Sequence, residues 1–223
     1  MAELCVVGSA TKLIYPTVMK LFITVTTKDM ELNKALGELA EDMGELRNLL
    51  TTAYKLPVET GPIFSRLELL SKAEEERGYK PCNVANQTIQ VFTATDKDLL
   101  VELIDLVSRL KYVSAFRFDF GLNPDDTEAV HMEATSAAFN HALSQASMYK
   151  SITMSSTYRL KAIRPVSGDG AVYCADRVRG ADVQSGTGFT QQQAELMKAN
   201  LVIKPIEYRV DLECLFELVK RER

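Results

Sequence analysis

Two histidines and one glutamate are the side chains with the clearest potential for chemistry. His131 and His141 are the only histidines in the chain, and Glu128 precedes His131 by three positions. A Glu-x-x-His step on a helix is the spacing used by di-iron bundles, which need two such steps and further carboxylates. This chain has one step. A metal-binding protein or enzyme that uses Glu128 and His131 is therefore an alternative hypothesis rather than the main prediction.

Both histidines lie on one helix, predicted over residues 124–149. Ten residues at 1.5 Å each place them about 15 Å apart along the axis, so they cannot share one metal ion. The apolar stripe predicted to face the core contains Met132, Ser136, Phe139, Leu143 and Ala146. This stripe puts His131 at its edge and His141 on the opposite, solvent-facing side.

The acidic run NPDDTE at 123–128 has a structural explanation. Asn123 is a good N-cap, and Pro124 suits the first helical position. Asp125, Asp126 and Glu128 then lie in the first turn, where negative charge complements the helix dipole. The run indicates helix initiation rather than a metal site.

Other patterns that carry chemistry do not occur in the sequence. It contains neither a GxSxG elbow nor a full GxxxxGK[ST] loop. Cys5, Cys82, Cys174 and Cys214 form no CxxC pair, so a zinc site is not expected, and free thiols are favoured over disulfides. Cys5 and Cys214 are expected to be buried in strands. We therefore assign no catalytic, cofactor-binding or metal-binding residue and expect no cofactor.

Hydrophobic periodicity predicts an α+β fold. Alternation indicates strands over 18–26, 63–70, 86–96, 114–120, 155–163 and 206–219, and helical periodicity indicates helices over 28–56, 96–110 and 124–149. Residues 57–64 read as a turn, 71–83 as a charged connector, and 164–204 as a long, partly mobile excursion. The expected architecture is one domain, 1–223, in which three main helices cover one face of a largely antiparallel sheet.

Capping and pairing details are predicted for the first two helices. The first has the apolar stripe Leu32, Leu36, Leu39, Met43, Leu46 and Leu50, and Thr26 or Thr27 can cap it. Its Gly37 and Gly44 mark either a close approach by another element or an exposed face, and both interpretations stay open. In the second helix the stripe is Leu99, Leu103, Val107 and Leu110, Asp96 is the expected N-cap, and Asp105 and Arg109 an expected i,i+4 pair.

Charge and hydropathy restrict the class of protein. The formal net charge is −4 and the basic residues are scattered apart from a terminal KRER, so nucleic-acid binding is not expected. No stretch approaches the ~20 apolar residues of a membrane span. The first residues, MAELCVVGSATKLIYP, lack the features of a signal peptide. The expected location is cytoplasmic as written, or periplasmic or at the cell envelope if a leader has been removed.

The order of elements over 86–163 resembles the SIMPL-domain family, which includes periplasmic immunogenic and oxidative-stress-defence proteins. The resemblance rests on TDKDLLVELIDLVSRL, the aromatic strand FRFDFGL, the Ala-rich helix EAVHMEATSAAFNHALSQA, the strand YRLKAI and the final KPIEYRVDLECLFEL. The N-terminal part and residues 57–83 depart from the family pattern. The resemblance implies a non-enzymatic or uncharacterised α+β protein that is able to oligomerise.

Three hypotheses follow for function. The first is an oligomeric scaffold or binding protein linked to stress defence, with a homo-oligomer as the expected partner. The second is the metal-binding protein or enzyme centred on Glu128 and His131. The third is an envelope protein whose signal peptide has been removed.

Overall fold

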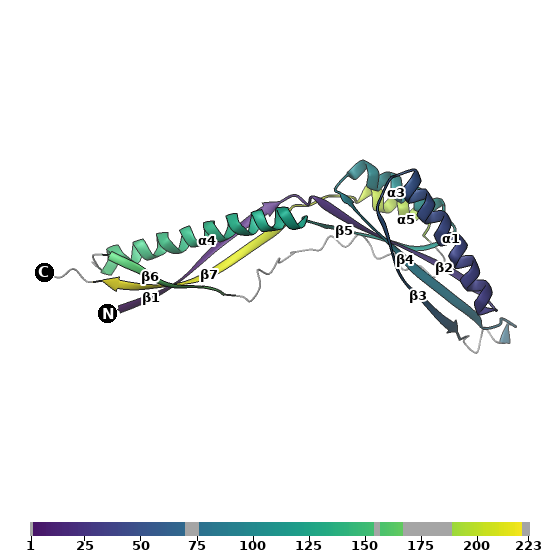
Figure 1. Cartoon of the computed structure of the whole chain (residues 1–223), viewed down its shortest axis with the longest axis horizontal. Helices are drawn as coiled ribbons and strands as arrows, with labels where there is room; N and C mark the ends of the chain where they lie inside the picture. Colours follow the sequence, from purple (N-terminus) through teal and green to yellow (C-terminus); the bar gives the residue numbers. More distant parts are fainter. Residues whose placement is uncertain (1, 70–75, 154–156, 167–188, 220–223) are drawn as a thin grey trace. The chain divides into compact units, whose positions relative to one another are not determined.

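The chain forms helices and strands that fall into two compact units. The computed structural model describes residues 2–69, 76–153, 157–166 and 189–219. Unit 1 contains β1, α4, β6 and β7, and unit 2 contains β2, α1, β3, β4, α3, β5 and α5. All strand pairs are antiparallel and lie in two separate sheets, so the α+β prediction is confirmed and the expected sheet is divided in two (Figure 1).

Unit 2 is a four-stranded sheet with helices on one face. Its elements are β2 (Val18–Asp29), α1 (Leu32–Thr52), β3 (Val58–Glu68), β4 (Cys82–Ala94), α3 (Lys97–Arg109), β5 (Val113–Gly121) and α5 (Gln191–Ala199). The strand order is β3-β4-β2-β5. This βαββαβ order is the ferredoxin-like arrangement, to which α5 is added beside α3.

The alternating strands bury one face of this sheet as predicted. Met19, Leu21, Ile23 and Val25 of β2 are fully buried, and Phe116 of β5 lies opposite Ile23. These side chains pack on α1 and α3, which cover the same face (Figure 1). The opposite face carries polar and charged side chains together with Phe22 and Phe92, which contact Arg117 and Lys20 respectively.

Helix ends in unit 2 agree with the predictions only in part. The Asp96 carboxylate accepts hydrogen bonds from the backbone of Asp98 at 2.9 Å and Leu99 at 3.1 Å, which confirms this cap. The first helix starts at Leu32 rather than near 28, because β2 continues to Asp29 and absorbs both threonines proposed as caps. Its buried residues are Ala35, Leu39, Met43, Leu46 and Leu50, and those of α3 are Leu100, Leu103, Ile104 and Val107.

Four further expectations need correction or narrowing. Asp105 pairs with Lys198 of α5 at 2.7 Å instead of with Arg109. Gly37 and Gly44 face open space in the described chain, which favours the exposed-face interpretation. The turn expected over 57–64 belongs to β3, whose pairing with β4 shifts register between Thr60 and Ile63. Within the excursion expected at 164–204, residues 191–199 form α5 and 167–188 lie outside the described residues.

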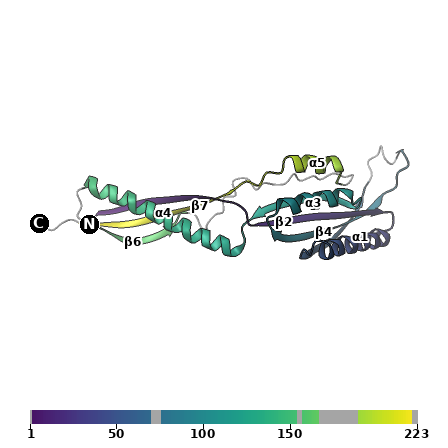
Figure 2. The ribbon, with the colours of Figure 1, turned by 90° about the horizontal axis from the view of Figure 1, so that it is seen from above.

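Unit 1 is a three-stranded sheet covered by one long helix. β1 (Ala2–Ile14), α4 (Pro124–Thr153), β6 (Thr157–Pro165) and β7 (Ile206–Val219) form it, with the strand order β1-β7-β6. Helix α4 lies along β1 and β7 (Figure 2). The alternation predicted for β7 is confirmed, because Tyr208, Val210, Leu212, Cys214 and Phe216 are buried toward this helix.

The side of α4 that faces the sheet differs from the predicted stripe. Ala134, Ala138, Ala142 and Ala146 have no exposed surface, whereas Met132 is 66% exposed and Ser136 is exposed. Phe139 and Leu143 are partly buried on one flank of this alanine stripe. A Cβ built on Gly8 of β1 would overlap the Ala138 carbonyl oxygen and come within 2.8 Å of the Ala142 Cβ. The helix therefore packs on the sheet through small residues at very close range.

Candidate functional site

His131 lies at the rim of α4, where it contacts the sheet. Its Nδ1 is 2.9 Å from the Tyr208 hydroxyl, and the two rings meet edge to face. Burial raises the pKa of Tyr208, so this phenol remains a neutral partner. The predicted position of His131 at the stripe edge is confirmed, and the tyrosine gives the histidine a structural contact.

Glu128 and His131 are not part of a cluster of metal-binding side chains in the described part of the chain. Both side chains are exposed on α4. Among the residues that the structure describes, no group of three or more His, Cys, Asp or Glu side chains could hold a metal ion. The geometry thus adds no support to the alternative hypothesis of a metal site here.

His141 contacts β1 and does not lie on the back of α4 as predicted. Its Nδ1 lies 3.1 Å from both the backbone N–H and the carbonyl oxygen of Ser9, and its Nε2 is 3.0 Å from the Gln145 amide nitrogen. The predicted exposure of His141 is confirmed, but the predicted side of the helix was wrong because the stripe was centred on larger residues. With the alanines facing the sheet, His141 reaches the backbone at the outer edge of β1.

The cysteines have different environments. Cys214 is buried in β7 as predicted, and burial raises the pKa of its thiol, with a smaller contribution from Cys5. Cys5 is exposed, which contradicts its expected burial, because β1 directs it away from α4. Cys82 is half-buried and its thiol lies 3.5 Å from a Glu68 carboxylate oxygen. Cys174 lies outside the described residues.

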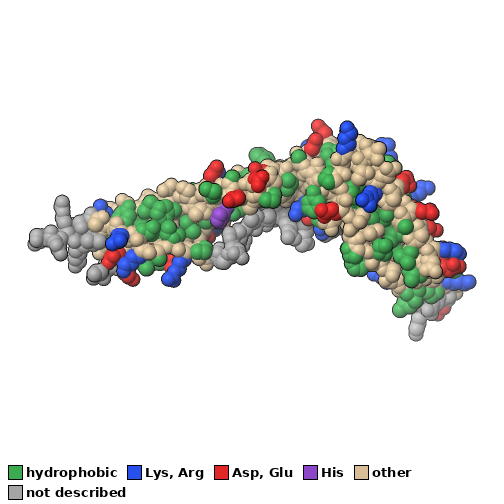
Figure 3. Space-filling model, in the orientation of Figure 1, with side chains coloured by type: hydrophobic (Ala, Val, Ile, Leu, Met, Phe, Trp, Pro, Cys, Tyr) green, Lys and Arg blue, Asp and Glu red, His purple; other side chains and the backbone are tan. Residues whose placement is uncertain are grey.

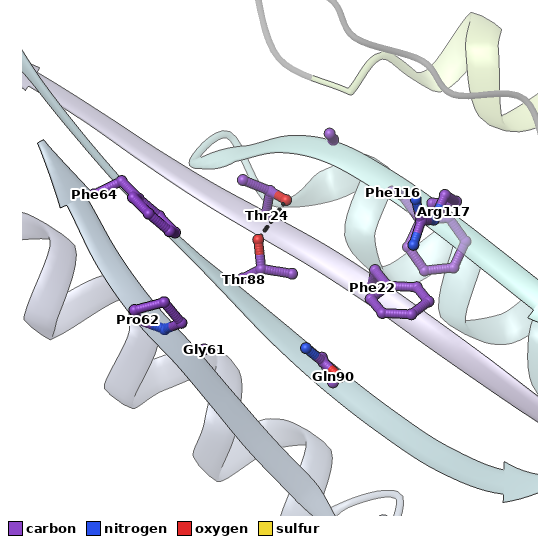
Figure 4. Close-up of a pocket in the computed structure, with 10 residues that line it drawn as sticks. Phe22, Thr24, Gly61, Pro62, Phe64, Thr88, Gln90, Phe116 and Arg117 are labelled. Carbon is purple, nitrogen blue, oxygen red and sulfur yellow. Dashed lines mark hydrogen bonds between the residues drawn. The ribbon is translucent and has the colours of Figure 1, made fainter. Parts of the chain in front are cut away.

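In the described part of the chain, a hollow on the open face of the unit 2 sheet is a candidate binding site (Figure 4). This sheet groove has a volume of about 390 Å³ and is lined by Phe22, Thr24, Gly61, Pro62, Phe64, Thr88, Gln90, Ala115, Phe116 and Arg117. Small side chains on three neighbouring strands form its floor, since Thr88, Thr24 and Ala115 lie in one cross-strand row. Larger side chains surround this row on both sides.

The floor of the sheet groove is polar. The hydroxyls of Thr24 and Thr88 lie 3.0 Å apart and form one hydrogen bond with each other. Each hydroxyl keeps further hydrogen-bonding capacity, since a hydroxyl has one donor and two acceptor lone pairs. The side-chain amide of Gln90 lies in the next row, opposite Phe22, and makes no hydrogen bond within the described chain. The floor can therefore both donate and accept hydrogen bonds.

Arg117 forms one wall of the groove together with Phe22 (Figure 4). Its guanidinium carbon lies 4.2 Å from the centre of the Phe22 ring, a cation–π stack. The only ion pair of Arg117 in the described chain is a long contact of 3.6 Å from Nη2 to the Asp119 carboxylate. Its Nε is buried without a hydrogen-bond partner. The stack holds the cation in place and leaves much of its donor capacity unused.

The opposite wall comes from the irregular part of β3. Pro62 and Phe64 lie beside the floor across from Arg117 (Figure 4). The register shift between Thr60 and Ile63 shapes this wall, and the Gln87 side chain donates a hydrogen bond of 2.7 Å to the Gly61 carbonyl. The groove thus combines two apolar walls, one fixed cation and a hydroxylated floor.

Sequence patterns located some of these residues but not the groove. Alternation put Phe22 and Thr24 on one face of β2, and Arg117 on the face of β5 opposite Phe116. The turn assigned to 57–64 concealed the wall at Pro62 and Phe64. A useful signal was the short side chains at Thr24, Thr88 and Ala115, which produce a hollow only when their strands are neighbours.

The surface charge and the helices add two observations. On the face seen in Figure 3, acidic and basic side chains of the described residues are interspersed rather than gathered by sign. No helix in the described part of the chain is long and apolar enough to cross a membrane.

Comparison with known proteins identifies the family. A search of curated proteins finds no match to this chain. The model of the SIMPL family, described as a protein of unknown function (DUF541), matches residues 4–204. That match covers most of the 223 residues and includes elements of both units, so the chain belongs to the SIMPL family.

Proposed function

We propose that the protein is a non-enzymatic binding protein that acts as an assembly of several copies and binds small carboxylates in the sheet groove. The observation that carries the proposal is the Arg117 cation stacked on Phe22 beside the Thr24–Thr88 floor. Concave sites with mostly apolar walls and a few fixed polar groups are the usual form of small-molecule sites.

The chemistry of the groove favours an anionic ligand with an apolar part. A guanidinium binds carboxylates through paired N–H donors, and these charge-assisted bonds are stronger than neutral ones. Phe22, Pro62 and Phe64 offer apolar surface on either side of the same hollow. The hydroxyls and the Gln90 amide can orient polar groups of the ligand.

Binding can be tested with phenylacetate and with phenylacetamide, its neutral match. Phenylacetate should shift the amide NMR signals of Thr24, Thr88 and Gln90, and phenylacetamide should shift them much less. Arg117→Met keeps the packing on Phe22 and should abolish the difference between the two probes. Arg159→Met, an exposed site on β6, is the matched control and should bind like the wild type. Equal binding of both probes, or unchanged binding by Arg117→Met, would count against the proposal.

The assembly is tested by light scattering over a range of protein concentrations. A mass that is a multiple of the 24.8 kDa chain is expected. A strict monomer at every concentration would contradict this part of the proposal. A link to stress defence rests on the family resemblance, and its test is the survival of a deletion strain under peroxide. Fractionation of the same cells decides between a cytoplasmic and an envelope location.

A further inference from the structure

β3 is an exposed edge strand with an unusual amount of apolar surface. It pairs only with β4 in the described chain, so its other edge has no strand partner. Ile63 is 54% exposed, Phe64 61%, Leu67 55%, and Leu69, just after the strand, 79%. Hydrophobic side chains are visible at the surface over the β3 region in Figure 3.

The helices of unit 2 leave the side chains on both faces of β3 uncovered. Ile63 and Leu67 lie opposite Gln87 and Asn83, on the face of the sheet that α1 covers farther in. Helix α1 lies over β2 and β4 and scarcely reaches β3. Phe64 and Arg66 lie opposite Asn86 and Val84, on the other face, which no helix of the described residues covers. Each face therefore ends at β3 with an uncovered apolar side chain.

Natural sheets usually protect such an edge. Lysine, inward-pointing charges, short strands and bulges are the common devices, and a long apolar edge is a site for pairing with another chain. β3 has 11 residues and contains no lysine, and its proline and register shift lie in its first half. The charges within 63–69 are Arg66 and Glu68, and Glu68 is paired with Lys28 of β2. Residues 63–69 thus present a mostly apolar stretch of edge that neither a lysine nor a bulge protects.

We propose that β3 pairs antiparallel with β3 of a second copy of this chain, with Ser65 on the two-fold axis. This inference rests on the proposed assembly and assigns it a surface. In this register Ile63 lies opposite Leu67 of the second copy, and Phe64 lies opposite its Arg66. Directly opposed side chains on one face interact most strongly, and the pairs formed are apolar with apolar and aromatic with cation. In this single register, the side chains on each face of β3 therefore match those on the same face of the second copy.

Registers displaced toward the C-terminal end of β3 are less favourable. A two-fold at Arg66 places that arginine opposite its own copy, and like charges directly opposed are destabilising. If the two-fold axis passed through Leu67, neither Ile63 nor Phe64 would lie opposite a residue of the stretch 61–69 in the second copy. The Ser65 register uses the whole stretch from Gly61 to Leu69 and opposes no like charges. It would also continue the four-stranded sheet of unit 2 into that of the second copy.

Cysteine crosslinking tests the register directly. In a C5S/C82S/C174S background that retains the buried Cys214, Ser65→Cys should form a disulfide-linked dimer on mild oxidation, since paired residues lie within disulfide range. An equimolar mixture of Ile63→Cys and Leu67→Cys should give the mixed dimer. Glu59→Cys is the negative control, because its two copies would be roughly 40 Å apart. Efficient self-crosslinking of Leu67→Cys without that of Ser65→Cys would overturn the register.

Charge insertion tests the surface itself. By light scattering, the double variant I63K/L67K should be a monomer or an assembly with fewer copies than the wild type. Its circular dichroism spectrum should be unchanged. Met132→Lys, at a comparably exposed apolar site on α4, should assemble like the wild type. An assembly that survives I63K/L67K and gives no Ser65→Cys dimer would overturn edge pairing and leave the proposed function intact. A monomeric wild type would overturn both.

Discussion

Tyr112 carries a buried hydroxyl that has no hydrogen-bond partner in the described chain. Burial, followed by the negative charges of Glu45 and Asp42, raises its pKa to about 12. An unfolded tyrosine ionises near pH ~10, so between about pH 10 and 12 the unfolded chain loses a proton that the folded chain keeps. The stability associated with this group is thus complete below about pH 10 and is lost as the pH rises toward 12.

We expect Tyr112→Phe to weaken this alkaline loss of stability. At neutral pH the variant should be as stable as the wild type or more stable by up to about 1 kcal/mol, because it removes an unsatisfied polar atom. Urea midpoints measured from about pH 8 to 11 check both points. Tyr79→Phe, at an exposed site, should reproduce the wild-type pH dependence. An unchanged alkaline slope in Tyr112→Phe would show that other groups cause the loss.

Residue roles were predictable where a local pattern decides them. Asp96 caps α3 because its side chain reaches backbone N–H groups two and three positions ahead, which any helix start permits. Asp105 was predicted to pair within its helix, yet it contacts Lys198, which is 93 positions away. His141 likewise acts on Ser9 at the far end of the sequence. Such long-range partners depend on packing, which periodicity does not encode.

The contact between α4 and β1 is set by small residues. The prediction favoured Met132 because hydrophobicity weights large side chains, but the close approach at Gly8 accepts only alanines. Large side chains are pushed to the flanks, as Phe139 and Leu143 are, or into solvent, as Met132 is. The Ala-rich composition of this helix was the available signal for close packing.

Gly8→Ala should therefore destabilise the protein far more than a methyl group usually does. The new Cβ meets backbone and Ala142 rather than a flexible side chain, so α4 must shift, with an expected cost of about 1–3 kcal/mol or more. Gly37→Ala is the matched control, since its Cβ enters open space in a helix and should stabilise by up to about 1 kcal/mol. Denaturant unfolding of both variants gives the comparison. Equal stability of the two would disprove the close-packing account.

At the scale of the whole chain, periodicity predicted the strands but not which of them share a sheet. β7 has the clearest alternation, yet it pairs with β1 and β6 rather than with the strands of unit 2. Strand partners are chosen by side-chain complementarity across long sequence separations, as between Val6 and Cys214, which are both buried against α4. The strand β1 itself has few sequence signals, because Gly8, Ser9 and Ala10 interrupt its apolar run. The α+β class could be predicted, and the division into two sheets could not.

The two sheets have separate hydrophobic cores, and this separation makes a testable difference in stability. Leu103 is fully buried in the core of unit 2, and Leu103→Ala should cost about 2–5 kcal/mol there. Hydrogen exchange should accelerate first at amides of β2, β4 and β5, while β1 and β7, which pack on α4, keep their protection. Gly8→Ala should give the reverse pattern. Equal acceleration in both sets of strands for either variant would show that the two cores unfold as one cooperative structure.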